Sequence, residues 1–137
     1  MVSGNLAHLS NKQAVRSDSG RYAVIDVGSN SIRLVIFDRL TRGLSVMFNE
    51  KVLCGLGSNI NVTGRLNEEG IHQALTNLRR FSILIREMVV QSLDAVATAA
   101  VRDARDGAEF LKRVYDECNL ELRVLSGQDE CRYTAYG

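Results

Sequence analysis

A short polar segment, residues 26–31, stands between two apolar runs and contains residue types that can bind an anion. Gly28 allows backbone conformations closed to other residues, and successive amide N–H groups in such a turn can point at one anion. Ser29, Asn30 and Ser31 add side-chain donors, so the segment predicts a phosphate-binding turn. An ordinary hairpin turn has the same composition, because Gly, Asn and Ser favour turns for conformational reasons alone.

Asp26 lies at the end of the first predicted strand and would lie beside a phosphate bound in this turn. A bare carboxylate repels a phosphate unless a divalent cation lies between them. The residue therefore predicts a site for Mg²⁺ or another divalent cation, with Asp26 as its protein ligand.

Length and charge limit the class of protein. A chain of 137 residues is long enough for one domain with a hydrophobic core. Its 17 basic and 16 acidic residues leave a net charge near zero and form no cluster of five or six like charges, which argues against a nucleic-acid binder. The 3 cysteines, Cys54, Cys118 and Cys131, follow neither a disulfide nor a zinc-site pattern and fit a reducing compartment.

The beginning of the chain differs from the rest. Residues 1–20 are polar and rich in Ser and Asn, and they lack the apolar stretch of a signal peptide. No apolar run approaches the roughly 18 residues that a membrane span needs. We therefore expect a disordered leader over residues 1–20 and one cytoplasmic domain over residues 21–137, with no membrane partner.

Three strands should open the domain. The apolar runs Tyr22–Val27 and Ile32–Asp38 predict a strand pair joined by the polar turn, and Leu44–Leu53 predicts a third strand. Strands that follow one another so closely pair antiparallel. The glycine-rich segment Cys54–Asn59, with Thr63 and Gly64 after it, is too polar and flexible for regular structure and predicts an irregular loop.

Helices and strands should alternate after this loop. Apolar residues recur at steps of three and four in two segments, Ile71–Val89, with Asn67 as N-cap, and Val101–Cys118. In the second segment the predicted buried face is Val101, Ala104, Ala108, Leu111, Tyr115 and Cys118. The runs Leu93–Thr98 and Leu120–Leu125 predict strands, and Ser126-Gly127-Gln128-Asp129 is a capping box that opens a last helix. The order β-β-β-α-β-α-β-α predicts an α/β domain with a mixed sheet, of the ribonuclease H-like class that includes actin and sugar kinases.

Four segments occur in the order and spacing of one phosphatase family. They are Val24–Ser31, Gly55–Gly57 with Thr63–Leu66, Ala97–Arg102, and Leu125–Glu130. Together they resemble the N-terminal part of the exopolyphosphatase and guanosine pentaphosphate phosphatase family, over about residues 21–137. The family has the same actin-like fold, so the resemblance and the order of elements indicate one fold class.

The resemblance implies a catalytic role for Glu130. In the family a phosphate chain lies in a cleft between two ribonuclease H-like lobes, and a glutamate at a helix start is the general base for the attacking water. Glu130 matches that position, and the positive helix end favours the ionised carboxylate that a base needs. The other interpretation is a solvated glutamate that interacts favourably with the helix dipole.

Arg102 matches the arginine of the family's A-T-x-x-x-R motif, and its planar guanidinium suits bidentate contact with phosphate oxygens. A salt bridge with Asp103 or Asp106 is the alternative. Thr98 could donate to a phosphate or simply complete the strand. Arg105 could be a second phosphate contact or a solvated side chain.

Two cysteines stand where the family has other residues. Cys54 occupies a loop position that is basic in many relatives, and Cys131 replaces the alanine common beside Glu130. The remaining charged residues of the first helix are interpreted as its solvated face: His72, Arg79, Arg80 and Arg86.

The resemblance implies a phosphoanhydride hydrolase that releases terminal phosphate from inorganic polyphosphate or guanosine pentaphosphate. Phosphate oxygens would contact Gly28, Ser29, Asn30, Ser31, Thr98 and Arg102. The family places a second phosphate loop on a second lobe beyond Gly137, so we expect this chain to be a fragment that is inactive alone. The family also implies a homodimer of the full-length protein, with contacts mainly outside this stretch.

Two other classes of protein would use the same turn. An actin-like or sugar-kinase-like module would bind ATP there and pass its γ-phosphate to an acceptor, which leaves Glu130 without a role as base. A non-catalytic sensor would bind guanosine tetraphosphate or pentaphosphate without turnover. Hydrolysis of polyphosphate without an acceptor distinguishes the hydrolase from both.

Overall fold

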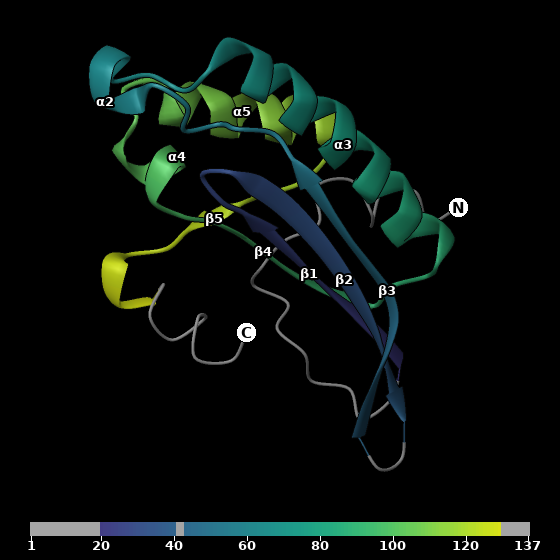
Figure 1. Ribbon diagram of the computed structural model, residues 1–137. Helices are drawn as coiled ribbons and strands as arrows, with labels where there is room; N and C mark the ends of the chain where they lie inside the picture. The colour runs from purple at the N-terminus through teal and green to yellow at the C-terminus, as the bar shows by residue number, and fades with distance from the viewer. Residues whose placement is uncertain (1–19, 41–42, 130–137) are drawn as a thin grey trace.

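The sheet is mixed and five-stranded, with the order β3-β2-β1-β4-β5 (Figure 1). The computed structural model describes residues 20–40 and 43–129. Antiparallel pairing joins β1 (Gly20–Val27) to β2 (Ser31–Leu40) and β2 to β3 (Gly43–Leu53). The strands β4 (Ser92–Ala97) and β5 (Arg123–Val124) extend the other edge in parallel with β1. The predicted leader lies outside the described residues except for Gly20, which begins β1.

Alternation along β1 separates the two faces of the sheet. Ile25 and Val27 are fully buried against the helices, whereas the intervening Asp26 is exposed. Tyr22 of β1 and Phe37 of β2 stack on the same face as Asp26, with ring centroids 5.1 Å apart. The carboxylate of Asp26 is therefore placed on the face opposite the core.

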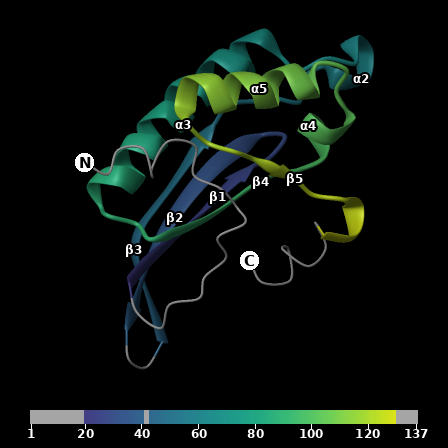
Figure 2. The same ribbon diagram turned by 180° about the vertical axis from the view of Figure 1, so that it is seen from behind.

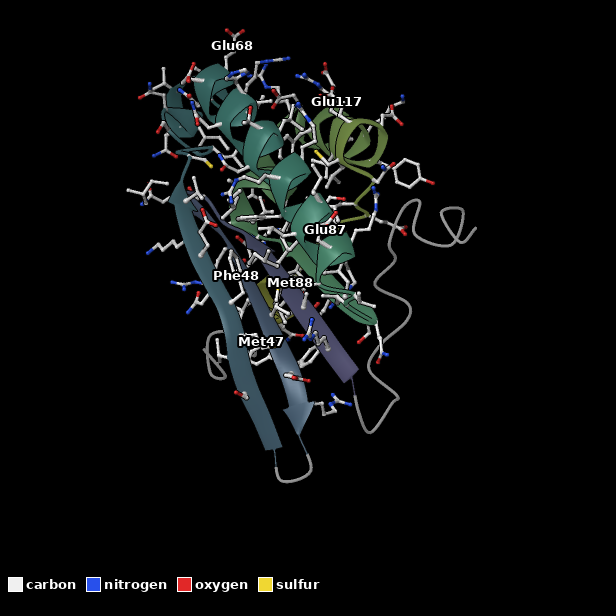
Figure 3. All side chains as sticks on the ribbon, turned by 90° about the vertical axis from the view of Figure 1, so that its right-hand side faces the viewer. Met47, Phe48, Glu68, Glu87, Met88 and Glu117 are labelled. Atoms are coloured by element: carbon white, nitrogen blue, oxygen red, sulfur yellow. The ribbon has the colours of Figure 1, made fainter. Side chains whose placement is uncertain are left out.

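Two long helices, α3 (Glu68–Glu87) and α5 (Gly107–Cys118), lie side by side over the other face of the sheet (Figures 1 and 2). Asn67 caps α3 as predicted, since its side chain accepts a hydrogen bond of 2.8 Å from the Gly70 amide. Figure 3 shows Glu68 and Glu87 at the two ends of α3. Phe48 of β3 and Met88, the C-cap residue of α3, are partly buried and pack against the core.

The second predicted helix is wrong in one respect, because the structure divides it into α4 (Ala99–Asp103) and α5. Ala104 is extended, with φ −73° and ψ 143°, and ends α4. The break rotates the buried face of α5 to Gly107, Phe110, Val114 and Cys118. Ala108 and Tyr115, which we expected inside, are exposed. A further short helix, α2 (Ile60–Thr63), lies in the segment that we expected to be irregular.

The first and last predicted helices differ at their ends. Val89, expected on the buried stripe of α3, lies beyond the helix and is 70% exposed. The final capping box is confirmed, because the Asp129 amide donates to Ser126 Oγ over 3.2 Å and the Ser126 amide donates to Asp129 Oδ2 over 3.4 Å. No helix among the described residues is long and apolar enough to cross a membrane.

Candidate functional site

The predicted phosphate turn is the tip of the hairpin between β1 and β2. The Gly28 amide donates to the Ser31 carbonyl over 2.8 Å, which leaves Ser29 and Asn30 at the tip. The conformational role predicted for Gly28 is wrong, because its φ is not positive. A Cβ at this position would instead lie 3.3 Å from the Ser31 carbonyl oxygen and 3.9 Å from Thr98 Oγ1. Close approach of neighbouring groups, and not a left-handed backbone, therefore favours glycine here.

A second segment, Cys54–Gly57, fixes the position of this turn, and we call it the glycine loop. The amides of Cys54 and Gly55 both donate to the Asn30 carbonyl, over 2.9 and 3.0 Å. The amide of Gly57 donates to the Ser29 carbonyl over 2.9 Å. The loop is therefore ordered against the phosphate turn, although its composition indicates flexibility.

The turn presents hydrogen-bond donors to solvent. Within residues 20–40 and 43–129, the amide N–H groups of Ser29 and Asn30 have no hydrogen-bond partner. The side chains of Ser29, Asn30 and Ser31 have none in that part of the chain either. Exposed amides on one tight turn, with hydroxyl and amide side chains beside them, are the donors that an anion-binding turn requires.

Asp26 is the second-last residue of β1, two positions before Gly28, with its neighbours Arg33 on β2 and Val96 on β4. The described residues contain no group of three His, Cys, Asp or Glu side chains that could hold a metal ion. One carboxylate is nevertheless a suitable donor for Mg²⁺, which commonly keeps several waters and binds through one or two carboxylates plus substrate phosphates. Asp26 therefore fits a cation that arrives with a phosphate and does not fit a cage built from protein alone.

The ends of β4 and β5 bring two further predicted residues to this edge of the sheet. Thr98 follows β4, and its amide and hydroxyl both donate to the Val27 carbonyl, over 3.0 and 3.4 Å. Arg102 lies on α4, where its Nη1 donates to the Leu125 carbonyl over 3.0 Å and its Nε lies 3.2 Å from Asp103 Oδ1. The salt bridge with Asp103 is thus present, and the same guanidinium joins α4 to the end of β5.

Arg105 and Asp106 face a different segment. The Arg105 amide donates to the Gly64 carbonyl over 2.9 Å, and its guanidinium packs over Gly64. Asp106 Oδ1 accepts a hydrogen bond of 2.9 Å from the Leu66 amide. These contacts favour a structural role for both residues, and Asp106 anchors the Leu66 amide, a contact that the sequence does not predict.

A polar groove of about 660 Å³, with Asp106 in its lining, lies at the beginnings of α3 and α5. Its lining includes Glu68, Glu69 and Glu109, with Arg65 and Arg113 as its basic residues. None of the predicted phosphate or metal ligands lines it. Its excess of carboxylates makes it a poor phosphate site, so the strand ends remain the candidate site.

Glu130 and Cys54 are the remaining residues that the sequence singled out. Glu130 lies outside the described residues, one position after the helical turn that the capping box opens. Cys54 is half-buried in the glycine loop, and burial raises the pKa of its thiol. Cys54 is therefore neutral at pH 7 and supplies no positive charge to a phosphate.

Residues 35–137 match the family model of the Ppx/GppA phosphatase family. The chain belongs to this family. Its curated relatives include "Exopolyphosphatase 1" of Mycobacterium bovis and of Mycobacterium tuberculosis, each 32% identical over 115 residues. The match covers 83% of this chain but only 33% of those relatives, so the chain spans about a third of their length.

Solved structures give the same assignment. The Aquifex aeolicus Ppx/GppA family member is 38% identical with a TM-score of 0.80, covering 83% of this chain and 37% of that one. An exopolyphosphatase from Cytophaga hutchinsonii is 31% identical with a TM-score of 0.77, covering 82% of this chain and 36% of that one.

A more distant neighbour shows how widely this fold is used. The ethanolamine utilization protein EutJ of Carboxydothermus hydrogenoformans is 14% identical, with a TM-score of 0.51, over 100% of this chain and 50% of that one. This likeness concerns the fold alone. With the observed strand order, the comparisons confirm the predicted ribonuclease H-like, actin-like class.

Proposed function

We propose that this Ppx/GppA domain forms one wall of a phosphoanhydride hydrolase that releases terminal phosphate from inorganic polyphosphate, guanosine pentaphosphate or both. The observation that carries the proposal is the phosphate turn. The N–H groups of Ser29 and Asn30 have no partner in the described part of the chain, and Asp26 lies near the end of β1, two positions before Gly28. In a family whose members include exopolyphosphatases, such donors are suited to a phosphate chain.

The residues at the strand ends would have different roles in phosphate and metal binding, according to their chemistry. Backbone amides at the turn and the side chains of Ser29, Asn30 and Ser31 would bind the phosphate oxygens. Asp26 would hold Mg²⁺, which, when bound, offsets the negative charge of the phosphates. Thr98 and Arg102 lie at the same edge, and the Arg102 guanidinium, which also bonds to Asp103 and to the Leu125 carbonyl, would contact phosphate.

Glu130 would act as the general base. Its carboxylate would take a proton from a water molecule while the water oxygen forms a bond to the terminal phosphorus. The bond from that phosphorus to the bridging oxygen breaks, which releases phosphate and a chain shorter by one unit. The helical turn that precedes Glu130, fixed by Ser126 and Asp129, supports this placement at a helix start.

The proposal is tested by phosphate release from long-chain polyphosphate with Mg²⁺, using the full-length protein that carries this domain. We expect Glu130→Gln to lower kcat by about 100-fold or more, the usual contribution of a positioned general base. Glu109→Gln is the matched control, because Glu109 is an exposed first-turn glutamate of α5 away from the strand ends.

Equal activity of wild type and Glu130→Gln would contradict the role of Glu130. A requirement for ATP and a phosphate acceptor would instead support a kinase-like module, and tight guanosine tetraphosphate binding without turnover would support a sensor.

A further inference from the structure

The glycine loop determines which way the phosphate turn presents its amides. The carbonyls of Ser29 and Asn30 both accept hydrogen bonds from this loop. In a planar trans peptide the C=O and the following N–H point in opposite directions. The N–H groups of the same two peptide units, those of Asn30 and Ser31, therefore point away from the glycine loop.

Gly57 makes the closest approach between loop and turn. A Cβ on Gly57 would lie 2.2 Å from Ser29 Oγ, 3.3 Å from Ser29 Cβ and 3.5 Å from Ala100 Cβ. The φ of Gly57 is not positive, so its backbone conformation is open to other residues. The reason for glycine at this position is therefore the space that the Ser29 hydroxyl occupies, between the glycine loop and the first turn of α4.

The glycine loop cannot easily retreat from a larger residue at position 57. Gly70 of α3 lies under it, since a Cβ there would be 2.9 Å from the Gly55 carbonyl oxygen and 2.9 Å from Leu56 Cα. Leu56 itself is fully buried in the core. A side chain at position 57 would thus displace Ser29 and would not displace the loop.

We propose that Gly57 is a positioning residue for phosphate binding, because its lack of a side chain fixes the Ser29 hydroxyl and the phosphate turn between the glycine loop and α4. The proposal rests on the proposed function, in which Ser29 contacts phosphate. Gly57 itself touches no substrate and acts through Ser29.

The test is a double-mutant cycle on tripolyphosphate binding with Mg²⁺, with the dissociation constant measured by titration calorimetry on the full-length protein that carries this domain. Every variant also carries Glu130→Gln, so that the ligand is not hydrolysed during the titration. We expect Gly57→Ala and Ser29→Ala each to weaken binding about tenfold, the size of one hydrogen bond to a charged group. The double variant should bind no more weakly than either single variant, because an alanine side chain at position 29 has no hydroxyl to displace. Ser58→Ala, an exposed change in the next residue, should leave the affinity unchanged.

Each outcome decides between the two proposals. Additive losses in the double variant, or an unchanged affinity in Gly57→Ala, would overturn the positioning role while the proposed function stands. Absence of tripolyphosphate binding by the full-length Glu130→Gln protein would overturn the proposed function, and the positioning role with it. If Gly57→Ala weakens binding in the background that keeps Ser29 but not in the Ser29→Ala background, the effect of Gly57 acts through the Ser29 hydroxyl. A general loss of folding would weaken binding in both backgrounds.

Discussion

Polar groups are paired in the helical layer, formed by α3 and α5, whereas donors in the strand-end region, at the turn between β1 and β2, are left without a partner among the described residues. In the helical layer, Arg80 pairs with Glu50 of β3, and Arg113 and Lys112 pair with Glu117 and Asp116 on the same helix. In the strand-end region, the amides of Ser29 and Asn30 have no partner within residues 20–40 and 43–129. We infer that substitutions in the layer should change stability, and that substitutions at the strand ends should change ligand binding.

Removing a core side chain should have the largest effect on stability. Leu78 of α3 is 0% exposed, so Leu78→Ala should lower the free energy of unfolding by about 2–5 kcal/mol through lost burial and the cavity that remains. Ile83→Ala on the same helix is the control, because Ile83 is 54% exposed. Urea unfolding measures both. A similar loss in the two variants would contradict the placement of α3 on the sheet.

Removing the Asp26 charge should change ligand binding and its dependence on Mg²⁺. Without metal, Asp26→Asn should bind tripolyphosphate about fivefold more tightly than wild type, since unit charges ~4 Å apart in water repel by about 1 kcal/mol. With Mg²⁺ the order should reverse, because the variant has lost the metal's protein ligand.

Binding measured in chelator and in Mg²⁺ tests this prediction for Asp26, with Glu109→Gln as the control for a removed carboxylate. An equal response of Asp26→Asn and wild type to Mg²⁺ would argue against Asp26 as the metal ligand.

The smallest effect is expected at the surface ion pair of the helical layer. The hydrogen bond from Arg80 lowers the pKa of Glu50 from its ordinary value of 4.5. The pair therefore stabilises the fold above the unfolded-state pKa, and this contribution is lost as the pH falls through the lowered pKa. Both side chains are partly exposed, so Glu50→Gln should cost about 1 kcal/mol or less at pH 7 and nothing at a pH well below 4.5.

Thermal unfolding of wild type and Glu50→Gln at several pH values measures this difference. A stability difference that persists in strong acid would show that the carboxylate charge is not its cause.

Local sequence patterns predicted most of this fold. The apolar alternation of β1 and the three- and four-residue steps of α3 identified both elements, since each buries one face against the same core. The break at Ala104 was missed because Ala104 and Arg105 favour helix and no proline marks the site. Distant contacts produce it, namely those of Arg105 with Gly64 and of Asp106 with Leu66.

The candidate site shows the same division between local and distant signals. The turn at Gly28 was visible as a run of small polar residues, and the structure places it at the tip of a hairpin as expected. The composition of Cys54–Gly57 also indicates a loop but predicts that it is flexible, whereas the structure orders it against the turn. The loop's hydrogen bonds with Ser29 and Asn30 join residues more than twenty positions apart. Local composition cannot predict contacts between residues so distant in the sequence.

The most direct test of the central claim is an ¹⁵N NMR titration of the chain with tripolyphosphate in the presence of Mg²⁺. We predict that the largest amide shifts fall on Ser29, Asn30 and Ser31. The amides around Arg79, Arg80 and Arg113 should respond weakly, because their guanidinium groups already face carboxylates. Largest shifts on α3 and α5, with an unchanged phosphate turn, would contradict the account.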